Sequence, residues 1–488
     1  MRAARLFVLG LLLSGVGCAT FTRPEGDGGW SAERRTTELG RLAIRAGVDF
    51  GAPPPDAAAA DAPRSIDLPT ALSMAAKGNR TIASAARRLD IEAERVRSAR
   101  GGLLPNATAS GRYSWFTDPQ ANRLRRLGET GAAPAANGGF PSAIEIRESE
   151  LSTVNGTLQQ TIDFGFGRGG HALAAARAGY RGEQARAWAT TLDQQLAVTR
   201  AYFQCLEARR LAEVTDQNVA LYRAQLGNAE AKFQSGRLTK NELLVVQVAL
   251  NGAEQDKEQR ALAIARARWT LNQAIGADVN AQTEIADVAE RPLVPAVEEA
   301  LRIAFAENPA LRSLVEEQQR LEETERSRAL QRIPTFYWGA AIDYSTSDIL
   351  QPRDVGSGFV GFTWDLGTDL RREAEIAEAR IASDRNRTEI ERQLRELEAL
   401  VRSAQQAAAE RLSATTSAET SVGQAEENLR IRRQQFDAGR ASSEDVLDAQ
   451  AILSAERASR ASALYQAHVR LAELRSMMGR NAAPEATR

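Results

Sequence analysis

The stretch Lys232-Phe-Gln-Ser-Gly-Arg-Leu-Thr-Lys-Asn-Glu242 has a close counterpart in Gln435-Phe-Asp-Ala-Gly-Arg-Ala-Ser-Ser-Glu-Asp445. Each copy places a Phe-x-x-Gly-Arg turn between two long, alanine-rich helical patterns. Glycine adopts positive φ at little cost and so can end the first helix, and the small polar residues that follow can cap the second. We therefore expect two copies of one unit, each built around a helical hairpin that turns at Gly236 or Gly439.

Long helical patterns flank both turns. They cover residues 171–235, 239–275, 370–437 and 441–478. A helix of 65 residues is ~98 Å long, which is too long for a compact domain. The return helix at 239–275 keeps a seven-residue apolar repeat, typical of a coiled-coil seam. Shorter helical patterns at about 67–101 and 297–331 begin the two units, so we expect each long helix to be covered by two shorter ones placed end to end.

Four stretches alternate between apolar and polar residues, as strands with one face of each kind do. They lie at about 106–117, 151–164, 335–346 and 357–366. Four strands cannot close a barrel, which takes about eight. Strands with one apolar face and aromatic residues near their ends are typical of outer-membrane barrels. Several copies of the chain are therefore expected to share one barrel. The spacing of the first two strands also predicts a long irregular loop, rich in Gly and Pro, at about 117–148.

The N-terminus carries a targeting signal. Arg2 and Arg5 precede a short apolar run, so residues 1–17 are predicted to be a signal peptide. The run ends in Gly15-Val-Gly-Cys18, which resembles a bacterial lipobox with glycine where leucine is usual. We expect Cys18 to carry lipid such as palmitate at the start of a tether, residues 18–65. The alternative is ordinary cleavage beside an incidental cysteine.

Composition argues against several classes of function. A net charge of −1 gives no general electrostatic reason to bind nucleic acid. Two histidines and two cysteines leave little material for a metal centre, so no metal or cofactor is expected. No nucleophile–base pair stands out, and the chain is not expected to be an enzyme.

Several motifs in a fixed order resemble the TolC-like outer-membrane efflux protein family, specifically its lipid-anchored branch. The motifs on which the resemblance rests are the two Gly-Arg hairpins together with Gly78-Asn79, Glu307-Asn308-Pro309, Ala99-Arg100 to Pro105, Asp163-Phe164-Gly165 and Asp365-Leu366-Gly367. The resemblance covers roughly 66–480, divided into repeats at 66–290 and 291–480 with a tail at 481–488. It implies a mainly α fold with a small antiparallel β part. It also implies a trimer, whose twelve-stranded transmembrane barrel continues into a periplasmic α-helical barrel of coiled coils.

The function that the resemblance implies is passive export. Members of the family are outer-membrane exit ducts of tripartite efflux or type I secretion systems. The expected partners are two further copies of the chain, a periplasmic adaptor protein, an inner-membrane transporter and outer-membrane lipid. The alternative is a soluble periplasmic coiled-coil scaffold or adaptor without transport activity, which would leave the four strands and the signal peptide unexplained.

The resemblance also implies that the hairpin tips narrow the periplasmic entrance and that acidic residues ring it. Asp445 and Asp448 match this pattern and, three residues apart on a helix, face one side. Glu242 holds the matching place in the first repeat, whereas Val245 replaces the second acid. Three copies would form two acidic rings that select for cations. The alternative is a solvated helix start, where acidic residues are favoured by the helix dipole.

Some relatives lock this aperture with a tyrosine and an arginine near the turn. Phe436 and Ala441 stand at those places here, with Arg440 next to them. Phe436 and Arg440 are therefore expected to lie at the aperture without forming the same lock.

Overall fold

The computed structural model describes residues 65–117, 120–123, 143–147, 150–162, 167–288, 292–346, 352–364 and 370–481. The chain divides into two units, Met1–Asp61 and Ala62–Arg488, and every described residue belongs to the second. The predicted signal peptide, Cys18 and nearly all of the predicted tether lie outside the described residues, as does most of the tail.

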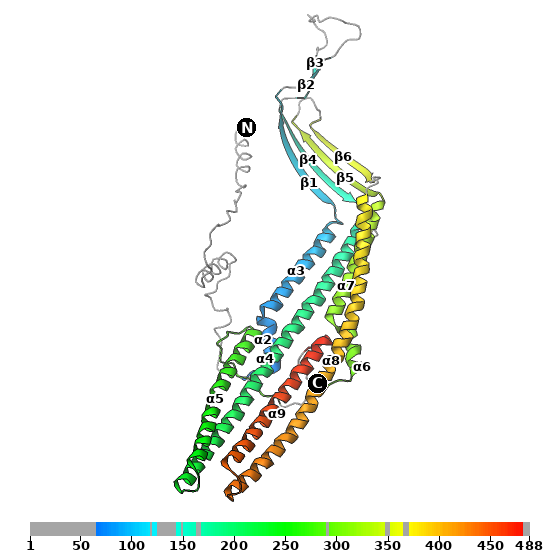
Figure 1. Cartoon of the computed structure of the whole chain (residues 1–488). Helices are drawn as coiled ribbons and strands as arrows, with labels where there is room; N and C mark the ends of the chain where they lie inside the picture. The colour runs from blue at the N-terminus through cyan, green and yellow to red at the C-terminus, as the bar shows by residue number, and fades with distance from the viewer. Residues whose placement is uncertain are drawn as a thin grey trace, which may run out of the picture. The chain divides into compact units, whose positions relative to one another are not determined.

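The second unit is mainly helical (Figure 1). Its helices are α2 (Leu68–Gly78), α3 (Arg80–Gly101), α4 (Arg168–Gln234), α5 (Lys240–Ile275), α6 (Val297–Glu307), α7 (Pro309–Ala329), the 3₁₀ helix η2 (Leu330–Arg332), α8 (Leu370–Asp437) and α9 (Ser443–Met477). Its strands are β1 (Asn106–Trp115), β2 (Gln120–Arg123), β3 (Ala143–Arg147), β4 (Glu150–Thr161), β5 (Thr335–Ser345) and β6 (Asp354–Thr363). The expected duplication is confirmed, because two half-helices, two strands, a long helix and a return helix occur twice in the same order.

Three local expectations are wrong. The stretches 67–101 and 297–331 are not single helices, because each is broken once, at Asn79 and at Asn308. The predicted loop at 117–148 is not irregular throughout, since β2 and β3 pair as an antiparallel ladder within it. The four main strands end one to three residues before the predicted limits.

Each long helix is covered by shorter ones, as the lengths predict. Helix α4, with 67 residues, packs against α5 over one part of its length and against α3 and α7 over another. Helix α8, with 68 residues, packs in the same way against α9 and α7. The cores between them are small clusters, the largest of which holds the fully buried Tyr202 and Leu206. None of the described helices combines the length and apolar character that a membrane span requires.

The four long strands form one antiparallel sheet in the order β1-β4-β5-β6. Its register aligns apolar residues in rows, with Phe336 opposite Phe362 and Trp338 opposite Val360. The other face carries polar residues, among them Asn155 opposite Asp343. Because directly paired residues point to the same side, one face of the sheet is apolar and the other mainly polar. The apolar face is uncovered in the single chain, where Val360 is 80% exposed.

In each of the two structural repeats, an asparagine lies at the break between the first half-helix and the second. The Asn79 side chain accepts a hydrogen bond from the Thr81 N–H (2.8 Å) and donates to Gln194 Oε1 (2.9 Å). Asn308 accepts from the Leu311 N–H (3.0 Å) and donates to the carbonyl of Met477 (2.9 Å). Each asparagine thus caps one half-helix and fastens the break to a neighbouring helix.

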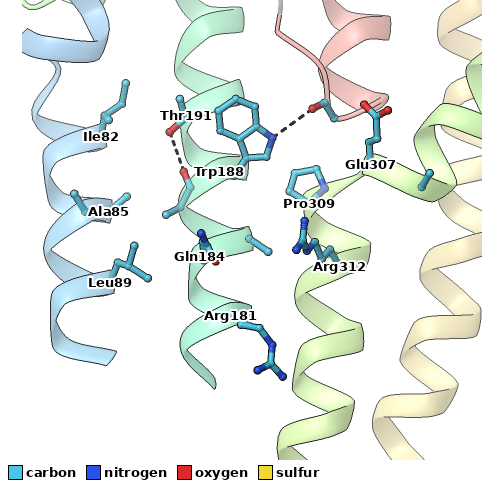
Figure 2. Close-up of a pocket in the computed structure, with 15 residues that line it drawn as sticks. Ile82, Ala85, Leu89, Arg181, Gln184, Trp188, Thr191, Glu307, Pro309 and Arg312 are labelled. Carbon is cyan, nitrogen blue, oxygen red and sulfur yellow. Dashed lines mark hydrogen bonds between the residues drawn. The ribbon is translucent and has the colours of Figure 1, made fainter. Parts of the chain in front are cut away.

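Glycines at the ends of the return helices make these breaks possible. Gly276 (φ +76°) and Gly479 (φ +80°) adopt the left-handed conformation. A Cβ on Gly479 would lie 2.7 Å from the carbonyl carbon of Glu307, closer than any real side chain approaches. The Trp188 indole donates to the Gly479 carbonyl (3.3 Å) beside a groove of about 720 Å³ between α3, α4 and the α6–α7 break (Figure 2).

Gly479→Ala should therefore destabilise the protein by about 1–3 kcal/mol, because it adds both backbone strain and a clash with Glu307. Gly423→Ala is the matched control, since Gly423 lies in α8 with open space around it. Thermal unfolding followed by circular dichroism should show a lower midpoint for the first variant only. Equal midpoints for both variants would contradict this account of the junction.

Candidate functional site

The two hairpin tips have the same backbone geometry. Gly236 (φ +73°) and Gly439 (φ +71°) are left-handed, as the sequence predicts. The N–H of the following arginine bonds back to a carbonyl five residues earlier, from Arg237 to Lys232 (2.9 Å) and from Arg440 to Gln435 (2.8 Å). This is the Schellman motif, which satisfies carbonyls at the end of a helix.

Glu242 and Asp445 have the same capping role at the two tips. Glu242 accepts from the Thr239 N–H (2.9 Å), and Asp445 accepts from the Ser442 N–H (2.8 Å). In return the hydroxyls of Thr239 and Ser442 accept the N–H of Glu242 and Asp445. These backbone bonds are the main reason that the pKa of each carboxyl lies below its usual value. Both groups are therefore charged at neutral pH and complete capping boxes.

Asp448 takes no part in a cap. It is exposed. Burial raises the pKa of Tyr222 in α4, and the charge of Asp448 adds to that rise. On α9, Arg457 follows Asp448 by nine residues, which places the two side chains about 180° apart around the helix. Glu213 and Tyr222 are related in the same way on α4. Asp448 and Arg457 thus lie on opposite sides of α9, and Tyr222, which is buried between the hairpins, is on the side of α4 away from Glu213.

Phe436 connects the two tips. The Lys232 ammonium of α4 lies 3.6 Å from the centre of the Phe436 ring and 3.7 Å from the Asp437 carboxylate. Such a cation–π contact contributes roughly 0.5–1 kcal/mol at an exposed site. Arg440 is exposed at the turn, whereas Arg432 lies 3.7 Å from Asp445. The structure thus brings Phe436 to Lys232 and Asp445 to Arg432, two contacts that the sequence did not indicate.

Leu447 fixes the position of the second hairpin against the first. It is 7% exposed and packs with Val219, Tyr222 and Val246 of α4 and α5. Its neighbours Val446 and Leu453 pack instead against α8. The start of α9 is therefore buried on two sides, and this double burial holds the nearby Asp448 in place. The sequence signal for this burial is the set of apolar residues Val446, Leu447 and Leu453 next to the acidic residues at the start of the helix.

A charged groove of about 580 Å³ runs on the other face, between α4, α8, α9 and residues 287–288. Arg457 donates to Glu426 (2.7 Å) and to Gln217 (3.2 Å). Arg210 bonds to Asp287, and Tyr465 donates to the same carboxylate (3.2 Å). Burial opposes ionisation of Asp287, but the bond from Arg210 prevails and its pKa is lowered. The groove thus presents a fixed pattern of both signs of charge.

Comparisons with known proteins agree with this geometry. Residues 71–277 match the family model described as "Outer membrane efflux protein". The chain is similar to this family over these 207 of its 488 residues. The match extends from α2 to the end of α5, and the second half of the fold repeats the elements of the first. No curated protein gives a significant match.

Solved structures of outer-membrane proteins share the fold of this chain. CusC superposes with a TM-score of 0.71 at 15% identity, over 88% of this chain and 99% of CusC. VceC from Vibrio cholerae gives 0.68 at 15% identity, over 85% and 97%. The CmeC outer membrane channel from Campylobacter jejuni gives 0.69 at 14% identity, over 86% and 87%. The expected TolC-like fold class is thus confirmed across nearly all of the described residues.

Proposed function

We propose that this protein is the outer-membrane exit duct of a tripartite efflux or type I secretion system, conducting its cargo passively. The observation that carries the proposal is an incomplete sheet, with one exposed apolar face and two unpaired edges, continuous with helices of 67 and 68 residues. Three copies would join β1 of one chain to β6 of the next and close a twelve-stranded barrel in the outer membrane. We assign the protein no enzymatic activity, in keeping with its match to the model described as "Outer membrane efflux protein".

The alternative of a periplasmic scaffold has no support from this sheet. A soluble protein would expose the rows that contain Trp338 and Val360 to water, which monomeric proteins avoid over large areas. An apolar outer face and a polar inner face around a shared lumen account for both sides at once.

Asp448 is the strongest candidate for the acidic ring at the periplasmic entrance. It is exposed, and it lies on the face opposite the charged groove. If the groove faces outward, Asp448 from three copies faces the axis and attracts cations. Asp445 and Glu242 contribute charge near the same tips, but their carboxylates are also bound to capping groups.

The other predicted tip residues have defined places in this entrance. Gly236 and Gly439 form the narrow turns, and Arg440 extends from the second of them. Phe436, held by Lys232, ties the two hairpins of one chain together. We propose that this contact takes the place of the lock that some relatives form with tyrosine and arginine.

The charged groove suits the periplasmic adaptor protein. Two helices with a channel between them accept a third helix, as in other helix-in-groove complexes. The pairs Arg457–Glu426 and Arg210–Asp287 would set the register of the adaptor, since exposed charges affect specificity more than affinity. The adaptor would in turn connect the duct to an inner-membrane transporter.

We also propose that Cys18 anchors the chain to the outer membrane through lipid. The lipobox-like sequence that ends at Cys18, followed by alanine, supports this. Metabolic labelling with a fatty-acid probe should mark the full-length protein and not a Cys18→Ser variant. Equal labelling of the two would contradict the anchor.

Neutralising the proposed ring tests the function. Asp448→Asn should lower cation selectivity and weaken block by multivalent cations applied from the periplasmic side, because it removes three charges from the narrowest point. Single-channel recording in planar bilayers measures both quantities. Glu426→Gln is the matched control, since Glu426 is an exposed acid that pairs with Arg457 in the charged groove on the opposite face. Full selectivity in the Asp448 variant would place the entrance elsewhere, and absence of any conductance from the unmodified protein would refute the channel.

A further inference from the structure

Two aromatic side chains interrupt the polar face of the sheet. The residues of this face include Thr108, Thr157, Asn155, Asp343 and Ser357. Tyr337 of β5 and Phe359 of β6 belong to the same face, because they alternate with Phe336, Trp338, Val360 and Phe362 of the apolar face. The alternation of apolar and polar residues along the strands would favour polar residues at positions 337 and 359. The two aromatic side chains there therefore need an explanation.

Glycines on the neighbouring strands receive the two rings. A Cβ on Gly339 would lie 2.5 Å from Cζ of Phe359, and a Cβ on Gly361 would lie 2.7 Å from Cζ of Tyr337. The two rings meet edge to face, with centroids 6.2 Å apart. Both side chains are half-buried. The ring pair is therefore held in one arrangement and still presents part of its surface to the polar side.

The pair lies where the strands join the helices. Tyr337 is the third residue of β5, which follows directly from η2 and Pro334, and Phe359 of β6 pairs with Gly339, two residues further along β5. Asp343 is six residues further along β5 on the same face, about 20 Å away along an extended strand. If the polar face lines the lumen, cargo that moves from the helical part into the sheet region passes the ring pair before it reaches the Asp343 carboxylate.

We propose that Tyr337 and Phe359 form a contact site for aromatic cargo, above all aromatic cations, at the junction of the helical tunnel and the barrel. The inference rests on the proposed channel function and adds a substrate class to it. Ring faces attract cations and stack with other rings, whereas the threonines and serines elsewhere on this face do neither. Three copies would supply three such pairs around one passage. Stabilisation of the sheet alone would account for rings over glycines, but not for a preference among permeating ions.

Block of single channels by two ions of equal charge tests the proposal. Tetraphenylphosphonium carries four rings, and tetraethylammonium carries none. In the double variant Tyr337→Leu/Phe359→Leu, which keeps apolar bulk over the glycines, the concentration of tetraphenylphosphonium needed for half block should rise about tenfold. Block by tetraethylammonium should change little. Tyr337→Phe, which keeps the ring, should retain tetraphenylphosphonium block.

The matched control is Val355→Thr, which changes an apolar residue of the same face at the start of β6, opposite Asp343 and away from the ring pair. Unchanged tetraphenylphosphonium block in a double variant that still conducts would overturn the proposal. An equal loss of block by both ions would also overturn it, because that result indicates a wider lumen and no aromatic recognition. If the double variant fails to assemble, the single variants Tyr337→Leu and Phe359→Leu decide by the same comparison. Absence of conductance from the unmodified protein would count against the channel function instead.

Discussion

The structure depends on one constraint of length. Helices α4 and α8 do not pack along each other, and every other helix of the described chain is much shorter, so each of the two is covered by shorter helices placed along it. Two helices that share one long partner must end close to each other, and their ends expose backbone groups that need partners. Asn79 and Asn308 supply those partners, and Gly276 and Gly479 leave room for the backbones to approach. The helical part of the chain is therefore packed along its whole length, because the ends of the shorter helices satisfy each other's backbone groups and leave each other room.

The same constraint explains how the tips are organised. Each hairpin turns through a Schellman glycine and restarts with a capping box, so its end is rigid without tertiary support. Between the hairpins, Leu447 supplies apolar packing and Lys232 a weaker polar contact. Because these contacts are few and weak, the free energy needed to separate the two tips is small enough for the binding of a partner protein to supply it. This balance suits the entrance that we propose, which would have to open without unfolding.

Much of this fold could be predicted from the sequence because its signals are local and repeated. The two Gly-Arg turns, the long helices and the four alternating strands follow from periodicity and from the conformational freedom of glycine. The breaks at Asn79 and Asn308 were missed, because a single capping residue hardly disturbs a helical pattern. The contacts of Lys232 with Phe436 and of Arg432 with Asp445 join residues of different helices, which periodicity does not reveal. The sequence already offered a capping role for Glu242 and Asp445 as the alternative to the acidic ring. The structure was needed to show that Asp448 is exposed and lies outside the capping box.

The account's central claim is that the open edges of the sheet, β1 and β6, pair between three copies of the chain. Native mass spectrometry of the full-length protein, extracted from the outer membrane in mild detergent, tests this claim most directly. The account predicts a single dominant species of three copies that persists on dilution. A folded monomer as the dominant species would contradict it, because the apolar face and both edges of the sheet would then have no partner.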